Sequence, residues 1–215
     1  MINDFGGPKG IFPNIEKYSN LIYKTKCPSV TSVQNRLYYV NSFLDIDITF
    51  GVKDNQPYSN YNLTNEHPPG HTIHDLVRTF VHVEPLKSNA TAHLQINLPY
   101  SFVTDVKDIE LVSLPVNVET ENCVYVPGGL KPYYWIRNFS CAFLLNDTTK
   151  DAKVKLRVDK PICLFYFNKP VDLKLTEETE KIKSYKDQNA GIVNYRNNIE
   201  KYYMNVISRR PRKLI

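Results

Sequence analysis

The 215-residue chain lacks the long apolar runs and the short signatures that assign many proteins to a class at first sight. No stretch of about 18 apolar residues is present, so the sequence predicts no transmembrane helix. The first residues carry no basic cluster followed by an apolar run, and we therefore expect no export signal. Walker motifs, nucleophile elbows and protein-kinase signatures are absent too, which excludes the enzyme classes that those motifs define.

Cysteine is scarce and widely spaced. The four cysteines, Cys27, Cys123, Cys141 and Cys163, form no Cys-x-x-Cys pair, which argues against a zinc ribbon or a thioredoxin-like redox site. Without an export signal we expect a reducing compartment and free thiols. Cys141 and Cys163 lie in apolar runs, where a free thiol behaves as a small hydrophobic side chain.

The net charge of +5 is concentrated at one end of the chain. Residues 196–215 hold six basic side chains and one acidic one, so the remainder sums to zero. A short basic terminus binds phosphate groups or an acidic protein surface, and the alternative is a solvated tail that aids solubility. No glycine-rich or aromatic pattern of a nucleic-acid binder accompanies it. The candidate partner-binding residues are Arg209, Arg210, Arg212 and Lys213.

Short strand-like segments dominate the middle of the chain. They recur at spacings of roughly 8–12 residues, with turn residues between them and no helical periodicity. We expect strands at 37–40, 43–50, 79–83, 92–98, 109–114, 122–126, 133–137, 140–145, 153–158 and 162–167. This pattern predicts a mainly β protein, an antiparallel β-sandwich or jelly roll over residues 35–173. Ile162–Phe167 is apolar throughout, as expected of a strand buried on both faces. Residues 51–70 are polar, and we expect a long loop or a loose hairpin there.

The two ends of the chain differ from this middle. Residues 1–34 form a predicted N-terminal arm and lead-in, because Met1–Pro13 is rich in glycine and proline and indicates no regular element. Residues 174–215 form a predicted helical segment that carries the basic tail. Thr176 followed by acidic residues is typical of a helix N-cap, and Tyr195–Val206 places apolar residues at helical spacing.

Four of the five histidines lie within sixteen residues, at His67, His71, His74 and His82. Together with Asp75, the last three could bring imidazoles and a carboxylate to one Fe, Zn or Mn ion. The spacing matches neither an H-x-D nor an H-E-x-x-H motif. The alternative is a proline-rich loop whose histidines are solvated, so we expect no resident cofactor unless this cluster binds a metal.

Two further groups admit a chemical and a structural interpretation. Asp45 and Asp47 could divide acid and base roles, but their alternation favours the wet face of a strand. Tyr133-Tyr134-Trp135 could stack a sugar or a base, but aromatic residues in strands more often belong to the core. Pro127-Gly128-Gly129 indicates a turn rather than a phosphate-binding loop.

Several segments between residues 25 and 175 resemble uncharacterised proteins of tailed bacteriophages, in particular those that infect marine cyanobacteria. The matching residues are Cys27-Pro28, Asn35, Tyr38, Val40, Ser42, Asp45, Ile46, Pro115-Val116-Asn117, Trp135 and Lys160–Phe167. The chain departs from that pattern at Phe43-Leu44 and Asp159-Lys160, and its late strand lacks a final proline. The resemblance implies a viral origin and a cupin-like or jelly-roll-like fold, and no catalytic residue comes with it.

These observations favour a phage protein that acts by protein–protein binding as a virion structural or assembly component. Its expected partners are other virion subunits or its own copies, with an acidic surface or nucleic-acid phosphates as contacts of the tail and no membrane. We expect it in the host cytoplasm during infection and then in the virion. One alternative is a metal-dependent, cupin-like or oxygenase-like enzyme that uses the His67–His82 cluster. A second is a small regulator that binds a host protein or nucleic acid through the basic tail.

Overall fold

The computed structural model describes a set of strands, one short helix and the connections between them. The described residues are 2–3, 15–17, 28–54, 56–64, 77–83, 90–133, 138–158, 160–173, 176–177 and 180. The helix is α1 (Pro28–Gln34). The strands are β1 (Ile2–Asn3), β2 (Ile15–Lys17), β3 (Leu37–Asn41), β4 (Ile46–Lys53), β5 (Gln56–Leu63), β6 (Val77–Val83), β7 (Ala90–Ser101), β8 (Leu111–Leu114), β9 (Glu119–Glu121), β10 (Cys123–Val126), β11 (Gly129–Leu130), β12 (Asn138–Leu145), β13 (Ala152–Leu156), β14 (Pro161–Phe167) and β15 (Thr176–Glu177).

Within the described residues the strands form three sheets, and all but one of the pairings that join them are antiparallel. Sheet I has the order β10-β12-β7-β1-β15, with β6 also paired to β7. Sheet II has the order β11-β8-β14-β3-β2, and sheet III the order β5-β4-β13-β9. The sequence-based prediction of a mainly β protein with antiparallel sheets is therefore confirmed.

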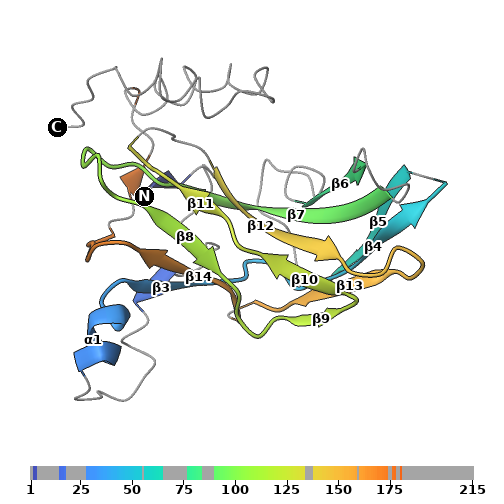
Figure 1. The fold of residues 1–215 in the computed structure, drawn as a ribbon, viewed down its shortest axis with the longest axis horizontal. Coiled ribbons are helices and arrows are strands. Elements are labelled where there is room, and N and C mark those ends of the chain that lie inside the picture. The colour runs from blue at the N-terminus through green and yellow to red at the C-terminus, as the bar shows by residue number, and fades with distance from the viewer. Residues whose placement is uncertain are drawn as a thin grey trace.

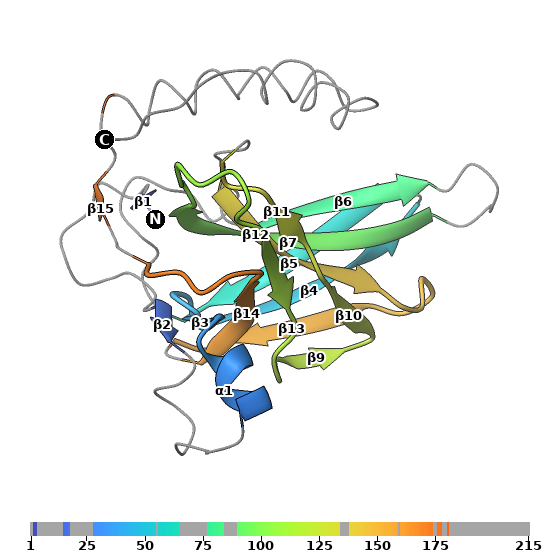
Figure 2. The ribbon, with the colours of Figure 1, turned by 60° about the vertical axis from the view of Figure 1, so that its left-hand side comes forward.

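Sheets II and III are two halves of one layer, because three pairs of consecutive strands continue from one sheet into the other. β3 is followed by β4, β8 by β9, and β13 by β14, and in both sheets these strands are neighbours in the same lateral order. Sheet I lies against this layer (Figures 1 and 2). The result is a sandwich-like arrangement of two layers with the hydrophobic core between them.

The core takes alternate side chains from every sheet, as the strand period of two requires. In β7, Ala92, Leu94, Ile96 and Leu98 are all fully buried, and the residues between them are half-buried. Phe165 of β14 joins the two layers: its ring centroid lies 4.8 Å from that of Phe139 in β12 and 5.0 Å from that of Phe102, both in edge-to-face geometry.

The chain crosses from one layer to the other at Asn122. β9, on one side of it, pairs with β13 in sheet III, and β10, on the other side, pairs with β12 in sheet I. Asn122 has a φ of 55°, in the left-handed region that asparagine tolerates better than most residues. Its side-chain nitrogen donates to the carbonyls of Asp147 (2.9 Å) and Lys150 (3.0 Å), and its side-chain oxygen accepts from the Asp147 N–H (3.0 Å). One residue thus fixes both the crossing and the neighbouring turn.

Of the two alternatives expected for residues 51–70, a long loop or a loose hairpin, the hairpin is confirmed for the first part of the segment. β4 and β5 form a regular antiparallel hairpin, with pairing from Lys53↔Gln56 to Ile46↔Leu63. Gly51 faces Tyr58, and a Cβ there would lie 3.2 Å from the Tyr58 ring, so glycine makes room for the hydrogen bond from the tyrosine hydroxyl to Asp151. The segment can be polar and still form a regular strand because β5 is an edge strand in which no side chain is fully buried.

Three other expectations differ from the structure at the chain ends and in β14. Ile2–Asn3, expected in an arm without regular structure, pairs with β7 and β15. Thr176 and Glu177, expected at a helix start, form β15, and the rest of the predicted helical segment is almost entirely outside the described residues. In β14 burial alternates only from Cys163 onward: Ile162 and Cys163 are both buried, whereas Leu164 and Tyr166 are half-buried, because the outer face of sheet II is partly open.

Two local predictions are confirmed. Cys141 and Cys163 are fully buried free thiols. Asp45 and Asp47 are half-exposed on the outer face of the layer. In the described part of the chain, no helix has the length and apolar character needed to cross a membrane.

Candidate functional site

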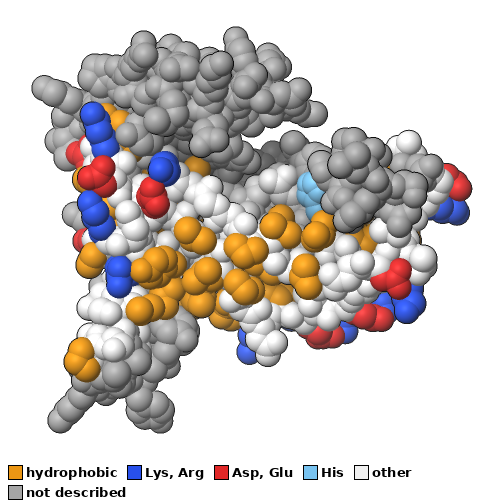
Figure 3. Space-filling view, viewed as in Figure 1, with side chains coloured by type: hydrophobic (Ala, Val, Ile, Leu, Met, Phe, Trp, Pro, Cys, Tyr) orange, Lys and Arg blue, Asp and Glu red, His pale blue; other side chains and the backbone are white. Residues whose placement is uncertain are grey.

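A strip of apolar side chains crosses the outer surface where sheets I and II meet. Figure 3 shows hydrophobic side chains gathered over β8, β10 and β12, with most charged side chains at the margins. The most exposed members are Val112 (37%), Val124 (48%) and Val126 (38%). Val124 is paired with Leu144, and Val126 with Ala142, which are half-exposed neighbours on β12. These five residues are named the valine strip.

The path of the chain explains why the strip is continuous. Pro127-Gly128 leads from β10 in sheet I to β11 in sheet II, and β11 pairs with β8, where Gly129 lies opposite Val112. Ser113 holds this crossing: its N–H donates to the Gly128 carbonyl (2.8 Å), and its hydroxyl oxygen accepts from the Gly128 N–H (2.9 Å). The outer faces of two sheets are thereby joined into one apolar surface.

The strip ends at an uncharged sheet edge. β10 is the last strand of sheet I in the described structure, and its sequence, Cys-Val-Tyr-Val, contains no charge. β9, the edge of sheet III, is different, because Glu119 and Glu121 form ion pairs with Lys155 and Lys153. Charged edges resist pairing with another strand, and an uncharged apolar edge does not.

A second feature lies where sheets II and III meet. The ladders of the three continuing strands end at Asn41, Leu114 and Leu156, so the breaks that follow form one row across the layer. Pro115 follows β8 and Pro161 begins β14, and proline cannot donate to a ladder hydrogen bond.

Two hydrogen bonds hold the row of breaks together. The Ser42 N–H donates to the Lys160 carbonyl (2.8 Å), and the Val158 N–H donates to the Asp45 carboxylate (2.7 Å). The register of β14 also shifts between Pro161 and Cys163, which adds a bulge at Ile162. The breaks are therefore ordered features of the layer.

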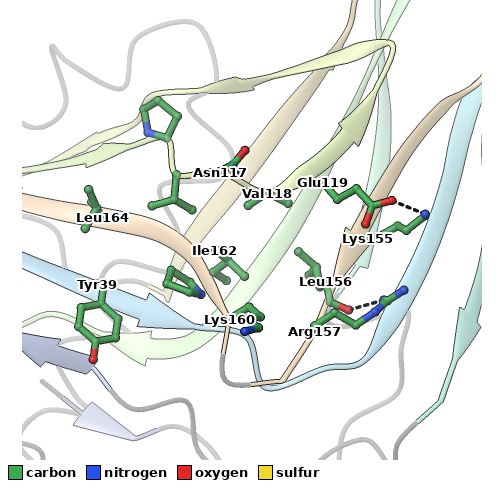
Figure 4. Close-up of a pocket in the computed structure, with 13 residues that line it drawn as sticks. Tyr39, Asn117, Val118, Glu119, Lys155, Leu156, Arg157, Lys160, Ile162 and Leu164 are labelled. Atoms are coloured by element: carbon green, nitrogen blue, oxygen red, sulfur yellow. Dashed lines mark hydrogen bonds and ion pairs between the residues drawn. The ribbon is translucent and has the colours of Figure 1, made fainter. Parts of the chain in front are cut away.

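A groove of about 480 Å³ lies over this row. Figure 4 shows Tyr39 and Leu164 at one end and the charged side chains of Glu119, Lys155 and Arg157 at the other. The apolar lining consists of Tyr39, Pro115, Val116, Val118, Leu156, Pro161, Ile162 and Leu164. Grooves of this size with an apolar lining and a few polar groups are typical of small-ligand sites.

Two of the three cations at the groove have a partner. Lys155 pairs with Glu119, and this hydrogen bond and charge raise the pKa of Lys155. Arg157 pairs with Asp47 at 2.7 Å and also donates to the Leu156 carbonyl at 2.7 Å. Lys160 is exposed, and its ammonium contacts no acidic side chain among the described residues. The groove is amphiphilic, and within its described lining the charge of Lys160 is the one that no acidic side chain compensates.

Two buried thiols of the core, Cys123 and Cys163, are held in the protonated state. Burial raises the pKa of Cys123 to about 11 and that of Cys163 well above its usual value. The hydroxyl of Tyr125 lies 3.9 Å from the Cys141 sulfur, and burial raises its pKa as well. At neutral pH these groups are protonated, and a thiol in that state is a poor nucleophile.

Most of the sequence-predicted site residues lie outside the described part of the chain. His67, His71, His74 and Asp75 are among them, as are Arg209, Arg210, Arg212 and Lys213. His82 lies on β6, opposite Thr91 of β7, and only its backbone is described. No group of three or more histidine, cysteine or acidic side chains suited to a metal was found in the described ranges. The metal site and the tail contact therefore stay predictions.

Sequence reasoning missed both surface features. A signal for the valine strip was present, since β10 alternates Val124 and Val126 with Cys123 and Tyr125, but either face of such a strand can be buried. The groove had no local signal, because it needs three breaks far apart in sequence to align. Searches for relatives add no assignment: no protein-family model, curated protein or solved structure matches the chain.

Proposed function

We propose that the chain is a structural or assembly subunit of a bacteriophage particle, with a jelly-roll-like sandwich body that acts by binding other copies of itself. The phage origin rests on the sequence resemblance described above. The mode of action is supported by one observation, the exposure of the valine strip beside the uncharged edge of β10. Contiguous exposed apolar side chains of this kind mark protein–protein contacts in soluble proteins.

A second copy is the partner that the charges favour. A two-fold axis beside β10 would bring identical edges together in antiparallel pairing, so the same short stretch of both copies forms the contact. β10 has no charge to repel its copy, whereas the same operation at β9 would bring Glu119 and Glu121 against identical carboxylates. Like charges directly opposite each other destabilise strand pairs.

The test is the oligomeric state of the full chain, measured by sedimentation equilibrium over a range of concentrations. We expect wild-type protein to associate, and Val124→Lys to weaken association more than about tenfold, because a lysine ammonium would be desolvated in the contact. Val106→Lys is the matched control, since Val106 has the same exposed fraction of 48% but lies outside the strip. A monomeric wild type, or equal weakening by both variants, would contradict the proposal.

Two further measurements separate the parts of the proposal. Mass spectrometry of purified phage particles should detect the chain if it is a virion component, and its absence there would limit it to assembly. Removal of residues 209–215 should leave association through the strip unchanged. If that truncation abolishes association, then the basic tail makes the contact.

A further inference from the structure

We propose that the groove between sheets II and III binds a small amphiphilic anion, a molecule with an apolar body and one carboxylate or phosphate group. This inference is independent of the valine strip. It rests on the shape of the groove, the separation of its apolar and charged parts, and the uncompensated charge of Lys160.

The apolar body of the ligand would lie at the end formed by sheet II. Tyr39 and Leu164 are paired neighbours on β3 and β14, and Ile162 lies between them and the charged end (Figure 4). Leu164 is half-buried, so it presents apolar surface that an occupant would remove from water.

The anionic group would be bound by Lys160. At the charged end Glu119 neutralises Lys155, and Asp47 neutralises Arg157, so among the described residues that line the groove the charge that remains is the positive charge of Lys160. An anionic group complements this charge. A cationic ligand would be repelled, and the same argument excludes the basic segment of residues 209–213 as an occupant.

The fixed backbone of Lys160 limits where its ammonium can meet the anion. The backbone of Lys160 is fixed on both sides, because its carbonyl accepts from Ser42 (2.8 Å) and its N–H donates to the Arg157 carbonyl (3.0 Å). Only rotation within the Lys160 side chain therefore changes where its ammonium lies relative to the groove. Such partial preorganisation lowers the entropic cost of binding.

The test uses decanoate as the probe, with decanol as the neutral and decyltrimethylammonium as the cationic comparison. Each is titrated below its micelle concentration or, for decanol, below its solubility limit into the full chain labelled with ¹⁵N, and amide shifts are followed. We expect decanoate to shift the amides of Asn117 and Leu164, to bind more tightly than decanol, and to weaken as salt is added. We expect no saturable shift with the cation.

Lys160→Gln should weaken decanoate binding about fivefold and leave decanol binding unchanged, because it removes a charge-assisted hydrogen bond at an exposed position. Lys53→Gln is the matched control, an exposed lysine at the far end of β4, and should bind decanoate like wild type. Thermal unfolding of both variants verifies that they fold. The proposal is overturned if decanoate and decanol bind equally well, if neither binds at millimolar concentration, or if the shifts occur at Val124 and Val126 instead.

Discussion

The role of Asn122 leads to a prediction in which backbone strain and side-chain hydrogen bonding can be measured separately. Asn122→Gly removes three short side-chain hydrogen bonds, two donated to carbonyls and one accepted from the Asp147 N–H, and a longer one donated to the Asp151 carbonyl (3.4 Å). At this partly exposed position water replaces them in part, so each contributes about 0.5–1 kcal/mol. The expected loss in the free energy of unfolding is therefore about 2 kcal/mol.

Asn122→Ala removes the same bonds and in addition forces alanine into a φ of 55°. A left-handed conformation costs alanine about 1–2 kcal/mol of folding free energy that glycine does not lose. Glycine in turn has the more flexible unfolded chain, which destabilises the glycine variant by about 0.4–1 kcal/mol and narrows the difference between the two variants. Alanine should thus be the more destabilising by about 0.5–1 kcal/mol, with a total of about 3 kcal/mol. For a chain of this size, that corresponds to a fall in Tm of about 6–12 °C.

Equilibrium unfolding in urea, followed by fluorescence and circular dichroism, measures both variants. Asn117→Ala is the matched control, because Asn117 is an exposed loop asparagine with no side-chain hydrogen bond among the described contacts, and it should change stability by less than about 0.5 kcal/mol. If glycine is as destabilising as alanine, or more so, the left-handed backbone is not what this position requires. If neither variant differs from wild type, Asn122 does not fix the crossing between the layers.

Three further outcomes are expected. Phe165→Ala should lower the free energy of unfolding, measured by urea denaturation, by about 3–5 kcal/mol, because it opens a cavity between the layers. A loss below about 1 kcal/mol would mean that the aromatic cluster is not the centre of the core. The Tm should fall as the pH rises from 9 toward 11, because the pKa of Cys123 is raised from 9.0 to about 11 in the folded state. In this range the thiol of the unfolded chain ionises first, so the unfolded state binds fewer protons and is favoured. Cys123→Ala should reduce the dependence of Tm on pH, and an unchanged dependence would count against this assignment. Lys155→Gln should leave the urea midpoint unchanged within error, because its pair with Glu119 is exposed, and a clear loss would show a larger role for the pair.

The alternation of apolar and polar residues was enough to predict a strand and its buried face where one face is buried and the other is exposed to water. The alternation in β13 predicted its burial, with Ala152, Val154 and Leu156 inside. It failed where an element depends on its neighbours. β5 is polar and is a strand because β4 supplies its pairing, and Thr176 has the chemistry of a helix cap but pairs with Ile2, from the other end of the chain.

The same division applies to the candidate surfaces. The residues that form the valine strip are ordinary apolar strand residues, and the exposure of Val124 and Val126 depends on which face of β10 turns toward the core. That choice is made at Asn122 and at Pro127-Gly128, where the chain changes layer. Without the crossing, Val124 and Cys123 are equally good candidates for burial.

The sequence by itself determined the strand-rich class, the free thiols and the uneven charge, because composition and a period of two are local properties of the chain. Tertiary structure decided the three-sheet arrangement, the apolar edge at β10 and the groove beside Lys160. The physical reason is that each of these requires segments far apart in sequence to align, and their alignment is fixed by hydrogen bonds and core contacts between layers rather than by any one segment.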